Sequence, residues 1–229
     1  MKRLFPALIV LLGAHSASAA VLDFEGFAAG TIIDDEYSSM GITISVQNIG
    51  GGPDLGVVFD TGNPTGGDDD LGAPFAPGPD NELGMLDPGN VLIIQERDNC
   101  DGLTCTVPDD EGTRAAGHIR IDFGGLVELS SIDFFDIEMA ETGPGEENRI
   151  TLFDANGMAM SLDFFTPDTG GDNRWDQVEF NVSGVSAVQI NLGGSGAIDN
   201  IVFTPVPVPA AFMLFAGALA ALGFTRRAG

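Results

Sequence analysis

The stretch HIRIDF, from His118 to Phe123, alternates strictly between polar and apolar side chains. Ile119, Ile121 and Phe123 share one parity, and the other three side chains are ionisable. Because successive side chains of a β-strand point to opposite faces, this pattern predicts a strand with one buried and one solvated face. Burial on one face is typical of antiparallel sheets, so the stretch predicts an antiparallel β fold.

Runs of similar length, rich in β-branched and aromatic residues, fill much of the chain. We expect strands in residues 21–27, 41–49, 55–61, 90–96, 130–138, 178–182, 185–192 and 197–203. In 130–138 the apolar residues change parity, which predicts either a β-bulge or a strand buried on both faces. Between the two ends of the chain, no stretch has convincing helical periodicity.

The stretch ITLFDANGMAMSLDFF, residues 150–165, predicts a β-hairpin. Its centre, Asp154 to Gly157, contains asparagine and glycine, which accept the positive φ angles of tight turns. Apolar residues flank the turn on both sides and form the two expected strands.

Residues 50–54 and 62–90 are rich in glycine, proline and aspartate and predict long loops. Many short strands joined by long acidic loops are typical of an antiparallel β-sandwich of the jelly-roll kind. We therefore expect an all-β, jelly-roll-like sandwich over residues 21–205. Its first strand and strand 197–203 are expected to lie side by side.

Residues 1–20 predict a secretory signal peptide. Lys2 and Arg3 precede an apolar run from Leu4 to Gly13, and Ala17 to Ala19 supply small residues before a cleavage point. The alternative is an anchor helix, but the apolar run has about half the roughly twenty residues that a spanning helix needs.

Residues 206–229 predict a C-terminal transmembrane helix with a sorting role. Ala210 to Phe224 contains no charged residue, and Arg226 and Arg227 follow directly. Arginines at this point are typical of the cytoplasmic end of a membrane segment, which would hold the rest of the chain outside the cytoplasm.

This C-terminal pattern resembles the PEP-CTERM sorting signal of Gram-negative bacteria. Pro207 and Pro209 match its two prolines, whereas Val208 stands where the commonest form has glutamate. The resemblance implies an exosortase-type membrane enzyme as partner and transient anchoring in the inner membrane. Release to the cell surface or the extracellular matrix would follow. A plain C-terminal anchor is the alternative.

The charge balance excludes two classes of partner. All 34 acidic residues lie between Asp23 and Asp199, a span with five arginines and no lysine. Binding to nucleic acid or to an anionic membrane surface requires clustered lysine and arginine, so we expect neither. So acidic a surface is compatible with divalent cations and a hydrated extracellular matrix.

Cys100 and Cys105 are expected to form a disulfide, because the two lie close in sequence in a chain expected to be exported. A zinc site would need four ligands, and His118 is the only histidine outside the expected signal peptide.

Several short motifs resemble the lectin-like jelly rolls of exported PEP-CTERM proteins of unassigned function. These are DFEGF, the spacing from Tyr37 to Gly41, GGDDDLG, NVLIIQE and GAIDNIVF. The resemblance covers most of residues 21–205 and implies an architecture more than a ligand.

Calcium is the expected cofactor, because it binds carboxylate and carbonyl oxygens of flexible loops. Asp68, Asp69 and Asp70 are one candidate ligand set, and no EF-hand spacing is present. Glu25 and Asp199 are a second candidate set, since the expected fold places their strands together and the resemblance implies calcium near such strands. The alternative is that these acids form a solvated loop face and a turn cap.

The stretch NRWDQ predicts a carbohydrate site, because sugar sites combine an aromatic face with charged hydrogen-bonding groups. Trp175, Arg174 and Asp176 are its candidate ligand residues, with an extracellular polysaccharide as the partner. The alternative is that Trp175 packs in the core.

We expect a non-enzymatic surface or extracellular-matrix protein stabilised by calcium. No serine lies in a G-x-S-x-G pattern, and His118 alternates with apolar residues on an exposed strand face. The first alternative function is a calcium-dependent carbohydrate-binding module. The second is a glycoside hydrolase with paired carboxylates.

Overall fold

The computed structural model describes residues 18–79, 81–143 and 145–207. In this part of the chain the fold is all-β and dominated by one large antiparallel sheet, as the sequence predicts. The strands are β1 (Ala20–Leu22), β2 (Thr43–Asn48), β3 (Gly56–Asp60), β4 (Ala76–Pro77), β5 (Asn90–Ile94), β6 (Gly117–Phe135), β7 (Arg149–Phe153), β8 (Phe164–Phe165), β9 (Arg174–Leu192) and β10 (Ala197–Pro205).

Four short 3₁₀ turns accompany the described strands. They are η1 (Ser38–Met40), η2 (Asp69–Leu71), η3 (Met139–Glu141) and η4 (Glu146–Asn148). Within the three described ranges, no helix has the length and apolar character needed to cross a membrane.

Strands β6 and β9 pair from one end to the other, except for residues 123–126 of β6, and form an antiparallel ribbon, the β6–β9 ribbon. The prediction of two separate strands in each, at 118–123 and 130–138 and at 178–182 and 185–192, is wrong. The register shifts between Asp122 and Val127, where Gly124 has φ 64° and Gly184 of β9 has φ 80°. Glycine accepts these angles, so the ribbon bends there without ending.

The two halves of the ribbon have different neighbours. Residues 117–122 of β6 pair with β2, and the matching half of β9 pairs with β7. Residues 127–135 of β6 pair with β10, whose other edge pairs with β1 and β5. The expected pairing of the first strand with 197–203 is confirmed, since Ala20 lies opposite Phe203. The sheet path is β3-β5-β10-β6-β9-β7-β8.

Both halves of the ribbon supply the main core. Ile119, Ile121 and Phe123, which the alternation assigns to a buried face, are buried in it. They share this hydrophobic cluster with Leu129 and Ile132 from the other half of β6. One bent ribbon therefore provides apolar side chains from both of its halves to a single interior.

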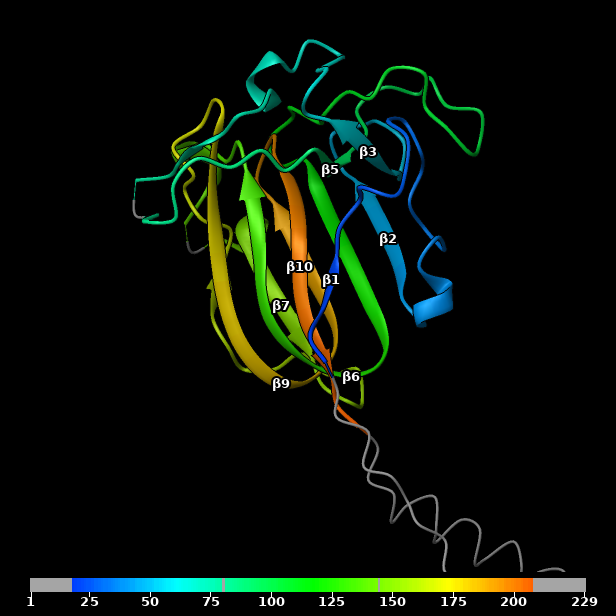
Figure 1. Ribbon diagram of the computed structural model, residues 1–229, viewed down its shortest axis with the longest axis vertical. Coiled ribbons are helices and arrows are strands. Elements are labelled where there is room, and N and C mark those ends of the chain that lie inside the picture. Colours follow the sequence, from blue (N-terminus) through cyan, green and yellow to red (C-terminus); the bar gives the residue numbers. More distant parts are fainter. Residues whose placement is uncertain (1–17, 80, 144, 208–229) are drawn as a thin grey trace, which may run out of the picture.

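The last part of β6 is buried on both faces, as its parity shift predicts. Phe134 belongs to the main core, and the next residue, Phe135, belongs to a second cluster on the opposite face. Leu71 and Phe75, from the long 62–90 segment, are buried in this second cluster. Burial of these two side chains fixes the segment across one end of the sheet, in cyan in Figure 1.

The hairpin after residue 149 is confirmed in part. The Asp154 carboxylate accepts hydrogen bonds from the backbone N–H groups of Asn156 (2.8 Å) and Met158 (2.9 Å). The turn is where the sequence places it. The returning strand is shorter than expected, because only the two residues of β8 pair with β7 as a strand.

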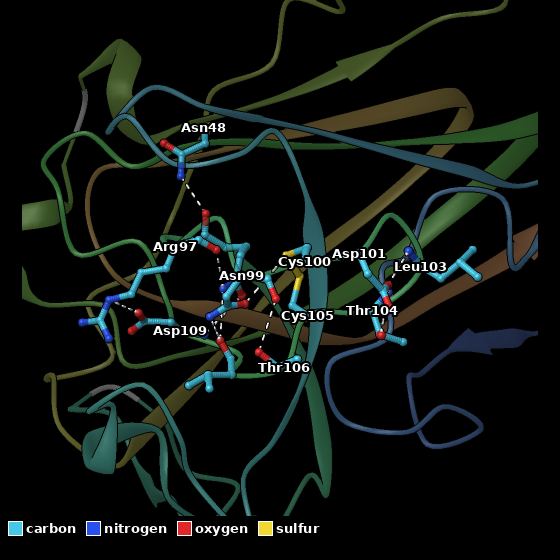
Figure 2. Close-up of a disulfide and its surroundings, with 12 residues drawn as sticks. Asn48, Arg97, Asn99, Cys100, Asp101, Leu103, Thr104, Cys105, Thr106 and Asp109 are labelled. Carbon is cyan, nitrogen blue, oxygen red and sulfur yellow. Dashed lines mark hydrogen bonds and ion pairs between the residues drawn. A yellow bond between two sulfur atoms is a disulfide. The ribbon is translucent and has the colours of Figure 1, made fainter.

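The Cys100–Cys105 disulfide is present, as Figure 2 shows. The Asp101 carboxylate accepts hydrogen bonds from Leu103 and Thr104, which lower the pKa of Asp101. Cys105 is buried in the second cluster, so the disulfide loop is attached to the sheet.

The course of β10 determines where the chain leaves the sheet. Strand β10 begins beside the end of β6 and runs to the bend of the ribbon, where the Val206 N–H donates to the Leu126 carbonyl (2.8 Å). The chain therefore leaves the sheet at the bend, opposite the 62–90 segment (Figure 1).

Several predictions fall on residues outside the described ranges. They are residues 1–17 of the expected signal peptide and, in the sorting motif, Val208, Pro209, Arg226 and Arg227. Pro207 is described and belongs to no strand or helix. The domain limits 1–20, 21–205 and 206–229 stay predictions.

The bend makes a specific demand on Gly124. A Cβ atom there would collide with the Gly41 carbonyl oxygen, and φ is positive. We expect Gly124→Ala to lower the free energy of unfolding by about 2 kcal/mol or more, measured by urea unfolding. Gly125→Ala is the matched control, because a Cβ at Gly125 meets no atom within 4 Å. Equal stability of the two variants would contradict the role of Gly124.

Candidate metal centre

Three aspartates from three separate segments meet at the end of the sheet that faces away from the bend. Asp70 lies in η2, Asp136 follows β6, and Asp172 precedes β9. Carboxylate oxygens of these three residues all lie within 4.8 Å of one another. We call this set the aspartate cluster.

Asn173 holds two of the segments together. Its backbone N–H donates to the Asp70 carbonyl (2.8 Å), and its side-chain amide donates to the Gly72 carbonyl (2.6 Å). A further hydrogen bond joins the amide to the Asp69 carbonyl (3.3 Å). Asn173 therefore fixes η2 against the start of β9, which brings Asp70 beside Asp172.

Asp136 is the buried member of the cluster. Its backbone N–H donates to the Arg174 carbonyl (2.9 Å), its φ is 59°, and its side chain is only 3% exposed. One carboxylate oxygen, Oδ1, is buried and has no hydrogen-bond partner among the described residues. A buried, charged carboxylate without a partner is unfavourable unless a proton or a bound cation neutralises it.

The electrostatics of the cluster favour a bound cation. Burial, and then the negative charges of Asp70 and Asp172, raise the pKa of Asp136 to about 8. Arg114 pairs with Glu138 and Glu141, and the Arg174 guanidinium donates to the Pro77 carbonyl (3.0 Å). Among the described residues, no ion pair joins a basic side chain to a member of the aspartate cluster.

Calcium fits this ligand set best. It takes six to eight oxygens at 2.3–2.6 Å, so two oxygens on one calcium lie at most about 5 Å apart, which matches the cluster. Magnesium requires a smaller octahedral shell and keeps most of its waters. Zinc sites use nitrogen and sulfur ligands, which the cluster lacks.

The predicted aspartates 68–70 do not act as one group. Only Asp70 belongs to the aspartate cluster. The Asp68 carboxylate accepts a hydrogen bond from the Asp110 N–H (2.9 Å), and burial raises the pKa of Asp68 to about 6. The Asp69 backbone carbonyl accepts hydrogen bonds from the Asn173 side-chain amide (3.3 Å) and the Gly72 N–H (3.1 Å).

The β1–β10 pairing places Glu25 and Asp199, the second predicted set, near each other. Their role as calcium ligands stays a prediction. Asp199 is 1% exposed, and its Oδ1 also has no hydrogen-bond partner among the described residues. Burial, with the charges of Asp133, Asp23 and Glu25, raises the pKa of Asp199 to about 8. Glu25 accepts a hydrogen bond from the Asn90 N–H (2.6 Å).

The described ranges contain one other group of three acids close enough to share an ion. This group is Asp34, Asp35 and Glu36. All three side chains are exposed, and they are consecutive in one turn. Because none of them is buried, this group lacks the feature that makes the aspartate cluster a candidate site.

The predicted carbohydrate residues fall in different environments. Trp175 is 5% exposed, stacks on Phe135 and donates its indole N–H to the Gly84 carbonyl (2.9 Å). This burial favours core packing, and a ligand role for Trp175 stays a prediction. Arg174 is exposed. Asp176 accepts a hydrogen bond from the Gln177 N–H (2.7 Å).

A pocket of about 660 Å³ adjoins the aspartate cluster, and Asp172 belongs to both. The pocket, which we call the Arg174 pocket, is lined by Pro79, Glu138, Met139, Asp168, Gly170, Gly171, Asp172 and Arg174. Its volume lies within the usual range of small-molecule sites.

Asp136 and Asp172 were not predicted from the sequence as metal ligands. Asp136 directly follows a strand end that is buried on both faces, and this position predicts that Asp136 is buried too. Asp172 lies in DTGGDN, which does not match the EF-hand pattern. That pattern takes most of its ligands from one short loop, whereas the aspartate cluster takes its members from three segments.

No protein-family model matches this sequence, and no curated protein is significantly similar to it.

The raised pKa of Asp136 predicts a pH effect in chelator. The unfolded side chain has a pKa near 3.9 and releases its proton first as pH rises, so Asp136 lowers folding stability progressively from about pH 4 to pH 8. We expect Asp136→Asn to be more stable than wild type at pH 8, with the difference vanishing near pH 4. Urea unfolding at several pH values measures it.

Asp199→Asn is a second, parallel test of the same pH effect. Burial raises the pKa of Asp199 to the same range, so this variant should show a similar pH-dependent gain in chelator. A pH-independent difference between wild type and Asp136→Asn would contradict the assigned burial of the Asp136 carboxyl group.

Proposed function

We propose that this chain is an exported, non-enzymatic protein of the cell surface or extracellular matrix, stabilised by calcium at the aspartate cluster. The observation that carries the proposal is the buried Asp136 carboxylate, which has an unpartnered oxygen beside two further aspartates. A calcium ion would neutralise these carboxylates and supply the missing partner.

The proposed fold is a jelly-roll-like β-sandwich. Two observations support it: the β6–β9 ribbon bends in the middle, and apolar residues from both halves share one core. Two sheet faces that pack together around a common interior are typical of sandwiches.

Export is supported by the disulfide and by the charge balance. Cys100 and Cys105 are joined, and disulfides persist in oxidising compartments outside the cytoplasm. The acidic composition is compatible with a hydrated matrix. The signal-like N-terminus and the resemblance of residues 206–229 to a PEP-CTERM signal add the proposed route, with an exosortase-type enzyme and the inner membrane as transient partners.

The geometry of β10 supports a surface role. The strand has nine residues, which span about 30 Å at 3.3 Å per residue, and it separates the aspartate cluster from the point where the chain leaves the sheet. A chain anchored through residues 206–229 would therefore present the aspartate cluster on the side remote from the membrane.

Thermal unfolding tests the calcium site. For the full chain in detergent at pH 7.5, calcium at about 100 times its Kd stabilises the folded state by about 2.7 kcal/mol. We expect the Tm to exceed that in chelator by about 5–10 °C. Magnesium at the same concentration should give a smaller rise.

Two variants locate the effect. Asp136→Asn should abolish the calcium-dependent rise in Tm, because it removes the buried charged ligand. Asp35→Asn is the matched control, since it removes an exposed acid from the other acidic group, and it should keep the full rise. An unchanged rise in Asp136→Asn would place the ion elsewhere, and no rise in wild type would overturn the calcium proposal.

Membrane fractionation tests the proposed anchor. In a Gram-negative host without exosortase, the full chain should sediment with the membranes. A chain that lacks residues 206–229 should be soluble outside the cytoplasm, because the uncharged segment 210–224 is gone. The substitution Val208→Glu is the control, because it leaves the uncharged segment 210–224 intact and should keep the full chain with the membranes. Equal partitioning of the full and shortened chains would contradict the anchor.

A further inference from the structure

The Arg174 pocket shares Asp172 with the aspartate cluster, so a molecule in the pocket would lie beside a bound cation. Three aspartates offer at most six carboxylate oxygens, and calcium takes six to eight ligands. Asp172 is exposed at the pocket. Oxygen atoms of a pocket ligand are therefore suited to complete the coordination of the ion.

The lining combines hydrogen-bonding groups with apolar surface. Arg174 supplies N–H donors, whereas Glu138 and Asp168 supply acceptor oxygens. Met139 is 76% exposed, and with Pro79 it gives the pocket an apolar wall. A saccharide has this same division, with hydroxyl groups at its edge and C–H groups on its faces.

The pocket is held by the fold rather than by mobile side chains alone. The Arg174 guanidinium donates to the Pro77 carbonyl (3.0 Å), and β4 pairs with β9 at this point. The Gly78 N–H donates to the Trp175 carbonyl (2.7 Å). A Cβ at Gly170, whose φ is 91°, would lie 2.8 Å from Arg174 Cδ, so glycine permits this close approach. A preformed site binds its ligand at a lower entropic cost.

The charge of the lining selects among saccharides. Three carboxylates and one guanidinium line the pocket, and two further aspartates lie beside it in the aspartate cluster. One calcium ion does not outweigh these negative charges. Uronic acids and sulfated sugars would be repelled, which leaves neutral sugars.

We propose that the Arg174 pocket binds a neutral saccharide, whose adjacent hydroxyl groups ligate the calcium of the aspartate cluster while Arg174 donates hydrogen bonds. Met139 and Pro79 contact the apolar face of the sugar. This inference rests on the proposed calcium site, and it adds a ligand class to a protein proposed above as a surface component.

A glycan array tests the proposal. The labelled full chain is applied in a detergent without a sugar headgroup, once in calcium and once in chelator. The array carries neutral oligosaccharides of mannose, glucose and galactose together with uronic acid polymers. We expect binding to neutral glycans in calcium, at least a tenfold loss of affinity in chelator, and no binding to the acidic polymers.

Variants separate the sugar contacts from the calcium site. Arg174→Ala should weaken glycan binding at least tenfold and keep the calcium-dependent rise in Tm. Met139→Ser changes an exposed side chain, so it should fold normally and weaken binding as well. Asp136→Asn should lose both properties. Arg120→Ala is the matched control, because Arg120 pairs with Asp122 away from the pocket and should leave glycan binding unchanged.

The outcomes distinguish the two proposals. A calcium-dependent rise in Tm with a blank array would overturn the saccharide site and leave the proposed function standing. The absence of a rise in Tm would overturn the calcium site and the saccharide site with it. Glycan binding that persists in chelator, or in Arg174→Ala, would also overturn the assigned pocket.

Discussion

The structure depends on the antiparallel pairing of β6 with β9, two strands of nineteen residues each. Strands β2, β4, β7 and β10 pair with this ribbon directly, and the other strands of the sheet attach to it through β7 or β10. Because the ribbon bends at Gly124, where its register shifts, its two halves contribute side chains to the same core. Without this bend, a loop would have to connect the two halves of each strand.

The same ribbon explains the position of the acidic groups. Where β6 ends, both of its faces are buried, and the outer face needs an apolar cover. Leu71 and Phe75 provide this cover, and their burial carries the neighbouring Asp70 to the end of the ribbon. The carboxylates of Asp70 and Asp136 repel each other. The burial of Leu71 and Phe75 offsets this repulsion and keeps the two carboxylates close together.

The sequence predicts features that depend on local pattern. The buried face of His118–Phe123, the turn at 154–157 and the pairing of β1 with β10 are all confirmed. It does not predict the continuity of β6 and β9, because a glycine in a strand pattern indicates a break as readily as a bend. Nor does it predict the aspartate cluster, whose three members come from distant segments and meet only through tertiary packing.

Calcium dependence would link folding to location in the proposed route. Without a cation, the folded chain must hold Asp136 either protonated or charged and unpartnered, and either state lowers its stability at neutral pH. Binding of calcium at the proposed site would offset this penalty by mass action, so stability would rise with the calcium concentration in the proposed compartment. Calcium bound at Asp136 would therefore favour the folded state in an oxidising compartment, where the Cys100–Cys105 disulfide also persists. Two independent features of the chain, one ionic and one covalent, would stabilise the protein in the same place.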